Sequence, residues 1–432
     1  IAAMTAGFTG AELANLVKEH PGVAILVDGH ADTGQRPEPT EPVVIIQPSR
    51  IIDTHIHLFD PSRPEGVPWP GSGSELYRPT LPADFRAIAE PAGVTGAVVV
   101  EASAWVEDNQ WLLDQTRDDP FFQGIVGNLE LRSADFADHL ARLASDKRFV
   151  GIRTKGLKTA DLDEQVIADL RALAAENLVL DILMAGMTLA DAQAIAEAVP
   201  ELRLILNHVG GTNIRGGSPS AAWMASIQAI AQLPNVYCKV SGLFQQSGKT
   251  PAPLEIEYYR PVLDVLWQAF GEDRLIYGSN WPVSNLRGDY AQHQELVLTY
   301  LSEKGEGAVE KSMWKNAVTF YGLDAIDTAV EERARAVLPE SLQLVQNFPN
   351  PFNGSTVFRF ALSRPGEVEL AIYNLAGQRV ATLADGAWGV GTHSLSWDGR
   401  DESGRALGSG VYFYRLKNAS TQTSPRKLLL LR

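Results

Sequence analysis

The chain has only one cysteine, Cys238, among its 432 residues. A single thiol cannot form an intramolecular disulfide or a thiolate-rich metal site, which excludes a disulfide-stabilised scaffold. The sequence also lacks any run of about 18 apolar residues, the length that a membrane-spanning helix needs. The first ten residues show neither the basic nor the apolar region of a secretory signal. Cys238 lies in an apolar stretch, where we expect an inert core residue.

Basic residues are in the minority, with Lys and Arg at 37 against Asp and Glu at 52, a net charge of −15. Such a balance opposes binding to phosphate backbones and anionic membrane surfaces, so we expect no nucleic-acid partner. The excess of acidic residues lies in one part of the chain. Residues 324–432 hold 12 basic and 11 acidic side chains, whereas residues 1–323 hold 25 and 41, a net charge of −16. The two parts are expected to differ in origin and function.

Glycine (37) and proline (25) are too scarce for a low-complexity chain, and 45% of the residues are hydrophobic. Most of the chain should therefore fold, and its length predicts two or three domains. We predict an N-terminal segment over 1–50, a barrel domain over 51–324, a linker over 325–338 and a β domain over 339–432. A proline-rich stretch at 35–42 marks the first boundary, and a charged stretch at 331–335 marks the second.

Eight short apolar runs alternate with helical patterns in the second segment, which is typical of repeated βα units. The runs are Ile51–His57, Ala97–Ala102, Gly124–Leu131, Phe149–Thr154, Leu178–Leu183, Leu202–His208, Val236–Gly242 and Leu275–Asn280. The clearest helical patterns are Leu162–Ala175, Leu189–Ala198 and Tyr258–Phe270. Eight such units predict an α/β fold of the (β/α)8 (TIM) barrel type.

The last segment instead alternates apolar and polar residues between Gly, Asn and Asp turns. Its predicted strands are Val357–Leu362, Glu367–Tyr373, Gln378–Thr382, Thr392–Trp397 and Val411–Leu416. This pattern predicts a small antiparallel β-sandwich.

Polar residues stand where several barrel strands end, which is where this fold places catalytic groups. His55 and His57 are two residues apart, so strand geometry points both imidazoles the same way. They can share a metal ion or a substrate, or they can be a hydrogen-bonded pair in the core. His208 closes the sixth strand and Asn280 closes the eighth.

Several motifs in this segment resemble the amidohydrolase superfamily, in particular the branch with sugar lactonases and pyrone-dicarboxylate lactonases. They are Asp53-Thr54-His55-Ile56-His57, Gly151-Ile152-Arg153, Asn207-His208-Val209-Gly210, Asn235 to Gly242, and Gly278-Ser279-Asn280-Trp281-Pro282. The resemblance runs in order from Ile51 to Leu323.

The resemblance implies an enzyme that hydrolyses a cyclic ester, such as a sugar lactone, with activated water. It implies that His55 and His57 position or polarise a small-molecule substrate and that His208 adds a third imidazole. Arg153 and Lys155, near the end of the fourth strand, can hold a carboxylate or polarise a carbonyl. For Lys155 we favour a solvated surface charge.

The chain departs from the superfamily at two strand ends. Metal-dependent members typically have Asp where this chain has Asn280, and an amide cannot accept a proton at neutral pH. The fifth strand carries Asp181 and no histidine. These departures leave at most one divalent, zinc-like ion on His55, His57 and His208, or a site without metal.

Without a metal, a different general base is needed. Glu101 at the end of the second strand, Asp181 and His208 are the candidates. Asn280 can donate a hydrogen bond to substrate or to a developing oxyanion. Trp69 and Trp281 can line a pocket for a sugar-like ring, although a tryptophan taken singly is more often a packing residue than a ligand-binding one.

Two stretches of the last segment resemble type A sorting domains of the type IX secretion system and, equally, the immunoglobulin-like domain of flagellar hook-capping proteins. They are Asn347 to Asn353 and Trp397 to Tyr414. The resemblance implies recognition by secretion machinery and a secreted or cell-surface location in a Gram-negative-type bacterium. The Asn280 departure also motivates an alternative function for the barrel, as a catalytically silent protein that binds a carbohydrate or small ligand.

Overall fold

The computed structural model describes residues 45–323 and 342–432, apart from 348–349, 355, 363, 390 and 419–420. The predicted linker over 325–338 and most of the predicted N-terminal segment lie outside the described residues. The described residues form a barrel domain and a β domain.

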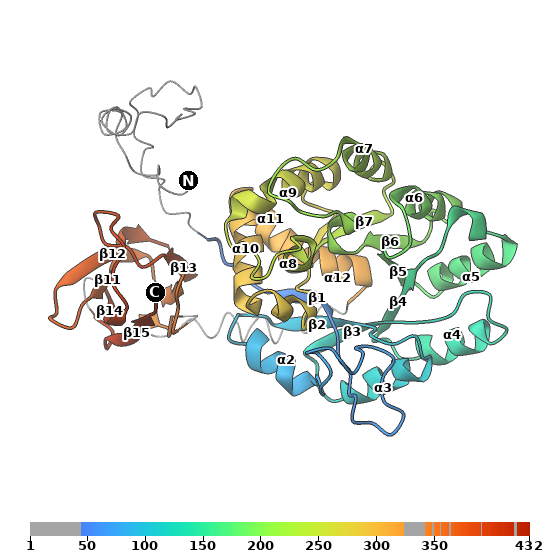
Figure 1. Cartoon of the computed structure of the whole chain (residues 1–432), viewed down its shortest axis with the longest axis horizontal. Helices are drawn as coiled ribbons and strands as arrows, with labels where there is room; N and C mark the ends of the chain where they lie inside the picture. The colour runs from blue at the N-terminus through green and yellow to red at the C-terminus, as the bar shows by residue number, and fades with distance from the viewer. Residues whose placement is uncertain are drawn as a thin grey trace, which may run out of the picture. The chain divides into compact units, whose positions relative to one another are not determined.

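The barrel is built from eight parallel strands, each paired with the next along the chain (Figure 1). The strands are β1 (Ile52–Ile56), β2 (Gly96–Val100), β3 (Phe122–Gly127), β4 (Phe149–Lys155), β5 (Val179–Leu183), β6 (Arg203–Leu206), β7 (Val236–Val240) and β8 (Leu275–Tyr277). The sheet closes just after β8, where the Asn280 amide donates to the His55 carbonyl over 2.8 Å. The His57 amide likewise donates to the Trp281 carbonyl over 2.8 Å. The predicted barrel is therefore confirmed.

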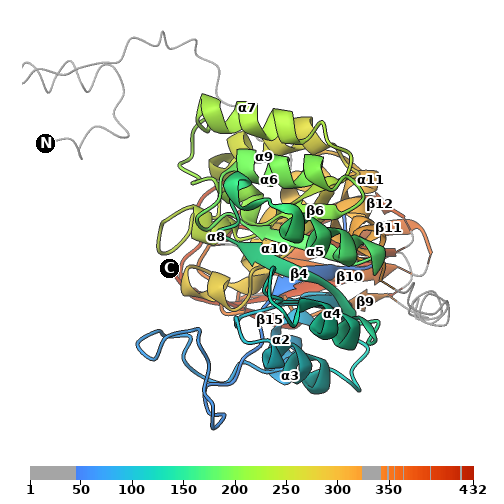
Figure 2. The ribbon, with the colours of Figure 1, turned by 90° about the vertical axis from the view of Figure 1, so that its right-hand side faces the viewer.

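Helices surround the strands in two perpendicular views (Figures 1 and 2). They are α2 (Pro82–Ala89), α3 (Glu107–Gln115), α4 (Phe136–Ala144), α5 (Glu164–Ala175), α6 (Leu189–Ala198), α7 (Ala221–Ile230), α8 (Leu243–Gln246), α9 (Ile256–Phe270), α10 (Tyr290–Ser302), α11 (Glu306–Glu310) and α12 (Asn316–Tyr321). α6 begins after Thr188 because Thr188 and Asp191 form a reciprocal capping box, in which each side chain accepts a hydrogen bond from the backbone N–H of the other. Among the described helices, none is long and apolar enough to cross a bilayer.

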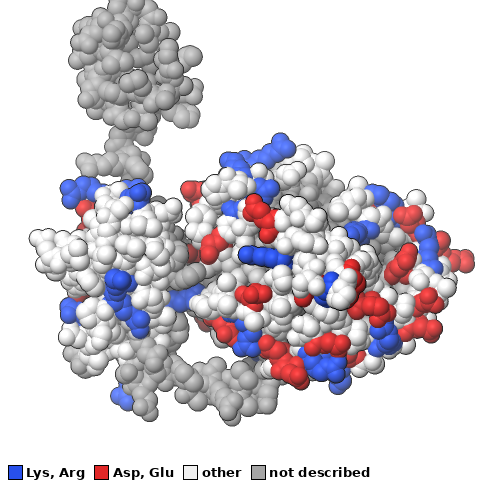
Figure 3. All heavy atoms as spheres, turned by 60° about the horizontal axis from the view of Figure 1, so that its bottom comes forward, with Lys and Arg blue, Asp and Glu red and all other residues white. Residues whose placement is uncertain are grey.

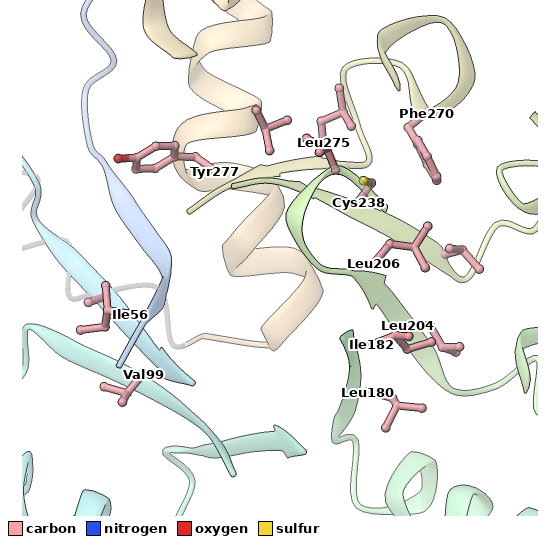
Figure 4. Close-up of a cluster of buried hydrophobic side chains, with 14 of the residues drawn as sticks. Ile56, Val99, Leu180, Ile182, Leu204, Leu206, Cys238, Phe270, Leu275 and Tyr277 are labelled. Carbon is pink, nitrogen blue, oxygen red and sulfur yellow. The ribbon is translucent and has the colours of Figure 1, made fainter. Parts of the chain in front are cut away.

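Alternation along the strands divides the apolar side chains into two layers. Leu180 and Ile182 of β5 and Leu204 and Leu206 of β6 are fully buried in the layer between the strands and the helices (Figure 4). Ile205, between the two leucines, belongs to the layer inside the barrel. Each such side chain contributes about 1.5–3 kcal/mol on burial, so these layers hold the strand ends in place.

A β-bulge in β1 aims the two strand-end histidines. Ile52 and Asp53 pair with consecutive residues of β2, but the register then shifts by one residue before Ile56. Ile52 faces the inner layer, whereas Asp53 and Ile56 face the helices, since Asp53 accepts a hydrogen bond from Tyr290 of α10. The extra residue lets His55 point into the barrel even though it lies three positions after Ile52. Bulges next to active sites commonly re-aim a side chain in this way.

The β domain contains two antiparallel sheets, ordered β13-β10-β9 and β12-β11-β14-β15. Its strands are β9 (Gln343–Leu344), β10 (Thr356–Leu362), β11 (Gly366–Tyr373), β12 (Arg379–Trp388), β13 (Gly391–Trp397), β14 (Gly410–Asn418) and β15 (Arg426–Leu430). Residues of both sheets, among them Phe358 and Leu416, form one apolar cluster. The predicted antiparallel architecture is confirmed, although β12 extends six residues beyond the predicted strand, from Thr382 to Trp388.

Acidic and basic side chains are interspersed on the face of the barrel domain shown in Figure 3. Many form ion pairs, such as Arg260 with both Glu257 and Glu303. Exposed pairs contribute little, about 0–1 kcal/mol each, so these pairs add little to the stability of the fold.

Candidate active site

Three imidazoles meet at the carboxyl ends of the strands. His55 lies in β1 and His57 just after its end, and His208 lies two residues after the end of β6. The ring centroids of His55 and His57 are 5.1 Å apart, and those of His55 and His208 are 4.5 Å apart. The exposed fraction is 0% for His55, 4% for His57 and 9% for His208, so His55 lies deepest.

All three imidazoles are neutral at pH 7. Burial lowers the pKa of His57 to about 3, and the charge of Arg153 adds to this effect. Burial also lowers the pKa of His55 and of His208 well below the usual value, with Lys239 and Arg153 respectively as the next contributors. A neutral imidazole has one N–H donor and one acceptor nitrogen, so the position of each proton decides what each ring can do.

The proton of His57 lies on Nδ1. Nδ1 is 2.9 Å from the carbonyl oxygen of Val100, which can only accept. Nε2 is therefore unprotonated, and it lies 3.3 Å from the side-chain oxygen Oδ1 of Asn280. Since an unprotonated nitrogen and a carbonyl oxygen repel each other, we assign this amide with its oxygen and nitrogen exchanged, so that the NH2 group donates to Nε2.

Backbone geometry fixes His208. Its φ of 50° lies in the left-handed region, and Nδ1 is 3.0 Å from the hydroxyl of Ser241. The next residue, Gly242, has a φ of 62°, and a Cβ there would stand 2.8 Å from His208 Nδ1. A glycine is required at this position because any other side chain would displace the imidazole.

A buried network lies beneath His55. Lys239 of β7 is fully buried and donates to Asp181 over 2.6 Å and to the Thr54 carbonyl over 2.8 Å. Its Nζ also lies 3.3 Å from His55 Nδ1. His55 Nε2 is buried and has no hydrogen-bond partner among the described residues. A buried polar atom without a partner is costly, which marks Nε2 as a contact point for a bound molecule.

Arg153 is held by both the carboxylate and the backbone carbonyl of Glu101. Arg153 Nε donates to Glu101 Oε1 over 2.7 Å, and Nη2 donates to the Glu101 carbonyl over 2.8 Å. The pair holds the Arg153 guanidinium close enough to the imidazoles to lower their pKa values. Lys155, at the end of β4, is exposed. Glu101 therefore serves to orient Arg153 in this arrangement.

The two tryptophans lie in different places. Trp69, in the loop after β1, has its ring centroid 5.7 Å from that of His57 and is 37% exposed. It also lines a small pocket together with Glu101. Trp281 is 5% exposed and packs against Phe85 of α2 with ring centroids 5.2 Å apart. Trp281 thus packs in the layer between the strands and the helices.

The three histidines are not arranged as ligands of one metal ion. Within residues 45–323 and the described parts of the β domain, no group of three or more His, Cys, Asp or Glu side chains is placed to hold a metal ion. A metal-binding histidine turns one lone pair to the ion and usually donates its other N–H to an acceptor. His57 meets this condition through Val100, but His55 Nδ1 faces the Lys239 ammonium, which is a donor. The sequence left two alternatives, one zinc-like ion on these histidines or a site without metal, and this donor set does not fit the first.

Sequence reasoning missed Lys239, Ser241 and Tyr321. Tyr321 of α12 donates to Asp181 over 3.1 Å. One signal was present, because Lys239 and Asp181 are single charges inside two apolar strands. Charges buried in such strands require a partner of opposite sign, and these two satisfy each other.

Fold and site together define a barrel enzyme whose reactive groups lie at the carboxyl ends of the strands. The chain belongs to the amidohydrolase family, since the family model described as Amidohydrolase matches residues 52–323. A second model, described as the FlgD Ig-like domain, matches residues 348–422.

Similar proteins match the barrel. An L-fucono-1,5-lactonase of Burkholderia ambifaria is 35% identical over 285 residues, which is 63% of this chain and 96% of that protein. An L-fucono-1,5-lactonase of Burkholderia multivorans is 28% identical over 283 residues, or 61% of this chain and 92% of that protein. A crystal structure of a Burkholderia multivorans amidohydrolase with bound zinc is 26% identical, with a TM-score of 0.56, and covers 63% of this chain and 99% of that one.

Proposed function

We propose that the barrel hydrolyses a sugar lactone to the corresponding hydroxy acid. The observation that carries this proposal is the buried, unpartnered Nε2 of His55, which lies beside two further neutral imidazoles. A neutral N–H in a dry site suits a carbonyl oxygen that gains negative charge during the reaction. The two similar proteins named L-fucono-1,5-lactonase support this substrate class.

In the proposed reaction, the lactone carbonyl oxygen binds between His55 Nε2–H and the Arg153 guanidinium. Water attacks the carbonyl carbon and loses a proton to His208, the most exposed of the three imidazoles. The ring C–O bond then breaks, and the leaving ring oxygen takes that proton as it becomes a hydroxyl. One water is consumed, and one carboxylic acid with a free hydroxyl is formed.

His57 and Asn280 have a positioning role in this scheme. The side-chain amide of Asn280 lies against the unprotonated Nε2 of His57, and Nδ1–H donates to the Val100 carbonyl, so the ring is fixed from both sides. Trp69 offers an exposed aromatic face next to His57 for the apolar side of a sugar ring. Lys155 is exposed at the end of β4, and the scheme assigns it no step. The proposed scheme requires no step on a metal ion.

A lactone panel tests the proposal. Ring opening of L-fucono-1,5-lactone and of other aldono-1,5- and 1,4-lactones is followed by acid release in a pH-stat, with the spontaneous rate subtracted. We expect turnover of at least one sugar lactone. If no lactone is turned over while calorimetry shows that a sugar lactone or sugar acid binds, the catalytically silent barrel is correct instead. The amide at Asn280, in place of a carboxylate, is the feature that favours this alternative.

For the β domain, we propose a role as an export signal read by secretion machinery, which places the protein outside the cell. The sequence resemblance to sorting domains supports this proposal. A reporter fused to residues 339–432 in a bacterium with a type IX system tests it. The reporter should reach the medium or the cell surface, and retention in the periplasm would contradict the proposal.

A further inference from the structure

Lys239 Nζ lies against two hydrogen-bond acceptors and one ring nitrogen of His55. An ammonium carries three N–H donors and no acceptor. Three atoms lie within reach: Asp181 Oδ2 at 2.6 Å, the Thr54 carbonyl at 2.8 Å and His55 Nδ1 at 3.3 Å. Two of the three N–H donors meet oxygens that accept, and the third faces His55 Nδ1, which can accept it only as an unprotonated nitrogen. The whole group is fully buried.

The surroundings of Asp181 contain only donors. Lys239 and the Asn207 amide both donate to Oδ2, the latter over 3.3 Å, and the Tyr321 hydroxyl donates to Oδ1 over 3.1 Å. An ionised carboxylate accepts and never donates, so it matches all three partners. Burial raises the pKa of Asp181 and lowers that of Lys239, while the charge of each opposes the shift of the other. The matching of donors and acceptors favours the ion pair.

We infer that Lys239 is a positioning residue, which donates to Nδ1 of His55 and so keeps the His55 proton on Nε2, where it faces the substrate. A neutral imidazole that accepts at Nδ1 must carry its proton on Nε2. Without Lys239, either ring nitrogen of His55 could hold the proton. The donor that the reaction needs would then be present in only part of the molecules. The catalytic consequence of this inference rests on the proposed function. The position of the His55 proton does not depend on that function.

The same arrangement keeps His55 neutral. A cation 3.3 Å from the ring opposes a second proton, and the Lys239 charge is, after burial, the largest cause of the lowered pKa of His55. It opposes a metal ion on His55 for the same reason. The Lys239 ammonium therefore favours a His55 imidazole that donates a hydrogen bond over one that binds a metal ion.

Nitrogen NMR of histidine-labelled protein tests the inference directly, because protonated and unprotonated ring nitrogens have well-separated 15N shifts. The His55 signals are assigned by their loss in His55→Ala. In the native protein we expect Nε2 to be protonated and Nδ1 to be unprotonated. If Nδ1 carries the proton, the inference is overturned, whether or not any lactone is turned over.

A double variant tests the causal link. Lys239→Met alone would leave Asp181 as an unpaired buried charge, so Asp181→Asn accompanies it. We expect the double variant to show a mixture of His55 protonation sites and a kcat roughly 100-fold lower, with KM changed less than about threefold. The matched control is Lys304→Met with Asp264→Asn, which removes an ion pair of 3.3 Å between Lys304, just after α10, and α9. It leaves the contact between Lys239 and His55 intact, so it should keep the native proton position and kcat. A folded double variant with native His55 shifts and native kcat would show that the ion pair is only structural.

Discussion

Gly278 lies directly against His55 at the seam where the barrel closes. A Cβ on Gly278 would stand 2.8 Å from the Cβ of His55 and 3.2 Å from its backbone nitrogen. Atoms do not approach that closely without displacement, so the absence of a side chain at Gly278 sets the position of His55. Gly278 acts through its lack of a side chain, which lets the backbone after β8 pass close to His55.

Gly278→Ala should therefore displace His55 and lower kcat/KM by roughly 100-fold, since a shift of about 1 Å suffices for such a loss. The overpacking should also lower the free energy of unfolding by about 1–3 kcal/mol. Gly217→Ala is the matched control, because a Cβ there meets no atom within 4 Å. Kinetics and urea unfolding of both variants check this expectation, and native kcat/KM in Gly278→Ala would contradict it.

Asn280→Asp should change the titration of His57. The new carboxylate would lie next to Nε2, about where the amide lies now at 3.3 Å. A nearby negative charge favours the protonated imidazole, so the His57 pKa should rise by about 1–3 units from its value of about 3. An NMR titration of the variant and of the native protein measures this rise. Equal His57 pKa values in the two proteins would refute the assigned contact.

Metal removal should leave the activity intact. Lys239 donates to His55 Nδ1, which leaves no three-histidine donor set of the kind that zinc prefers. Dialysis against a chelator, followed by elemental analysis and the lactone assay, should give less than one zinc per chain and an unchanged kcat. Stoichiometric zinc whose removal abolishes turnover, and whose return restores it, would show that the His55 assignment is wrong.

Stability should fall in mild acid, and His293 allows one contribution to be isolated. Burial lowers the pKa of His293 to about 3. Because the unfolded chain binds this proton at a pKa near 6.5, the contribution is complete above that pH and is lost as the pH falls towards 3. From pH 7 to 5.5, the native protein should lose roughly 1 kcal/mol more unfolding free energy than His293→Leu does. Urea unfolding at both pH values measures the difference, and parallel losses would contradict a buried neutral His293.

The fold could be predicted from sequence because its signals are local. Predicted Leu189–Ala198 matches α6 in full, and predicted Phe149–Thr154 differs from β4 by one residue. Strand ends were less predictable. Predicted Leu275–Asn280 extends three residues beyond β8, because the chain leaves the sheet to form the closing seam after Tyr277. The local pattern of apolar and polar residues does not show at which residue the pairing of a strand with its neighbour ends.

The site was predictable in its residue types and less so in its contacts. The strand-end rule brought His55, His57 and His208 together, since it depends only on topology. The direction of Trp281 depends on the backbone after β8, and the aim of His55 depends on a one-residue bulge, neither of which alternation reveals. The buried pair of Lys239 and Asp181 joins residues 58 positions apart, which a single sequence shows only as two isolated charges.

The central claim is that His55 donates to the lactone carbonyl during ring opening. The most direct measurement is kcat for L-fucono-1,5-lactone, or for the best lactone of the panel, in the native protein and in His55→Ala, with circular dichroism to verify the fold of both. Loss of one oxyanion donor should lower kcat by about 100- to 1,000-fold. A folded His55→Ala protein that opens the lactone at the native rate would contradict the account.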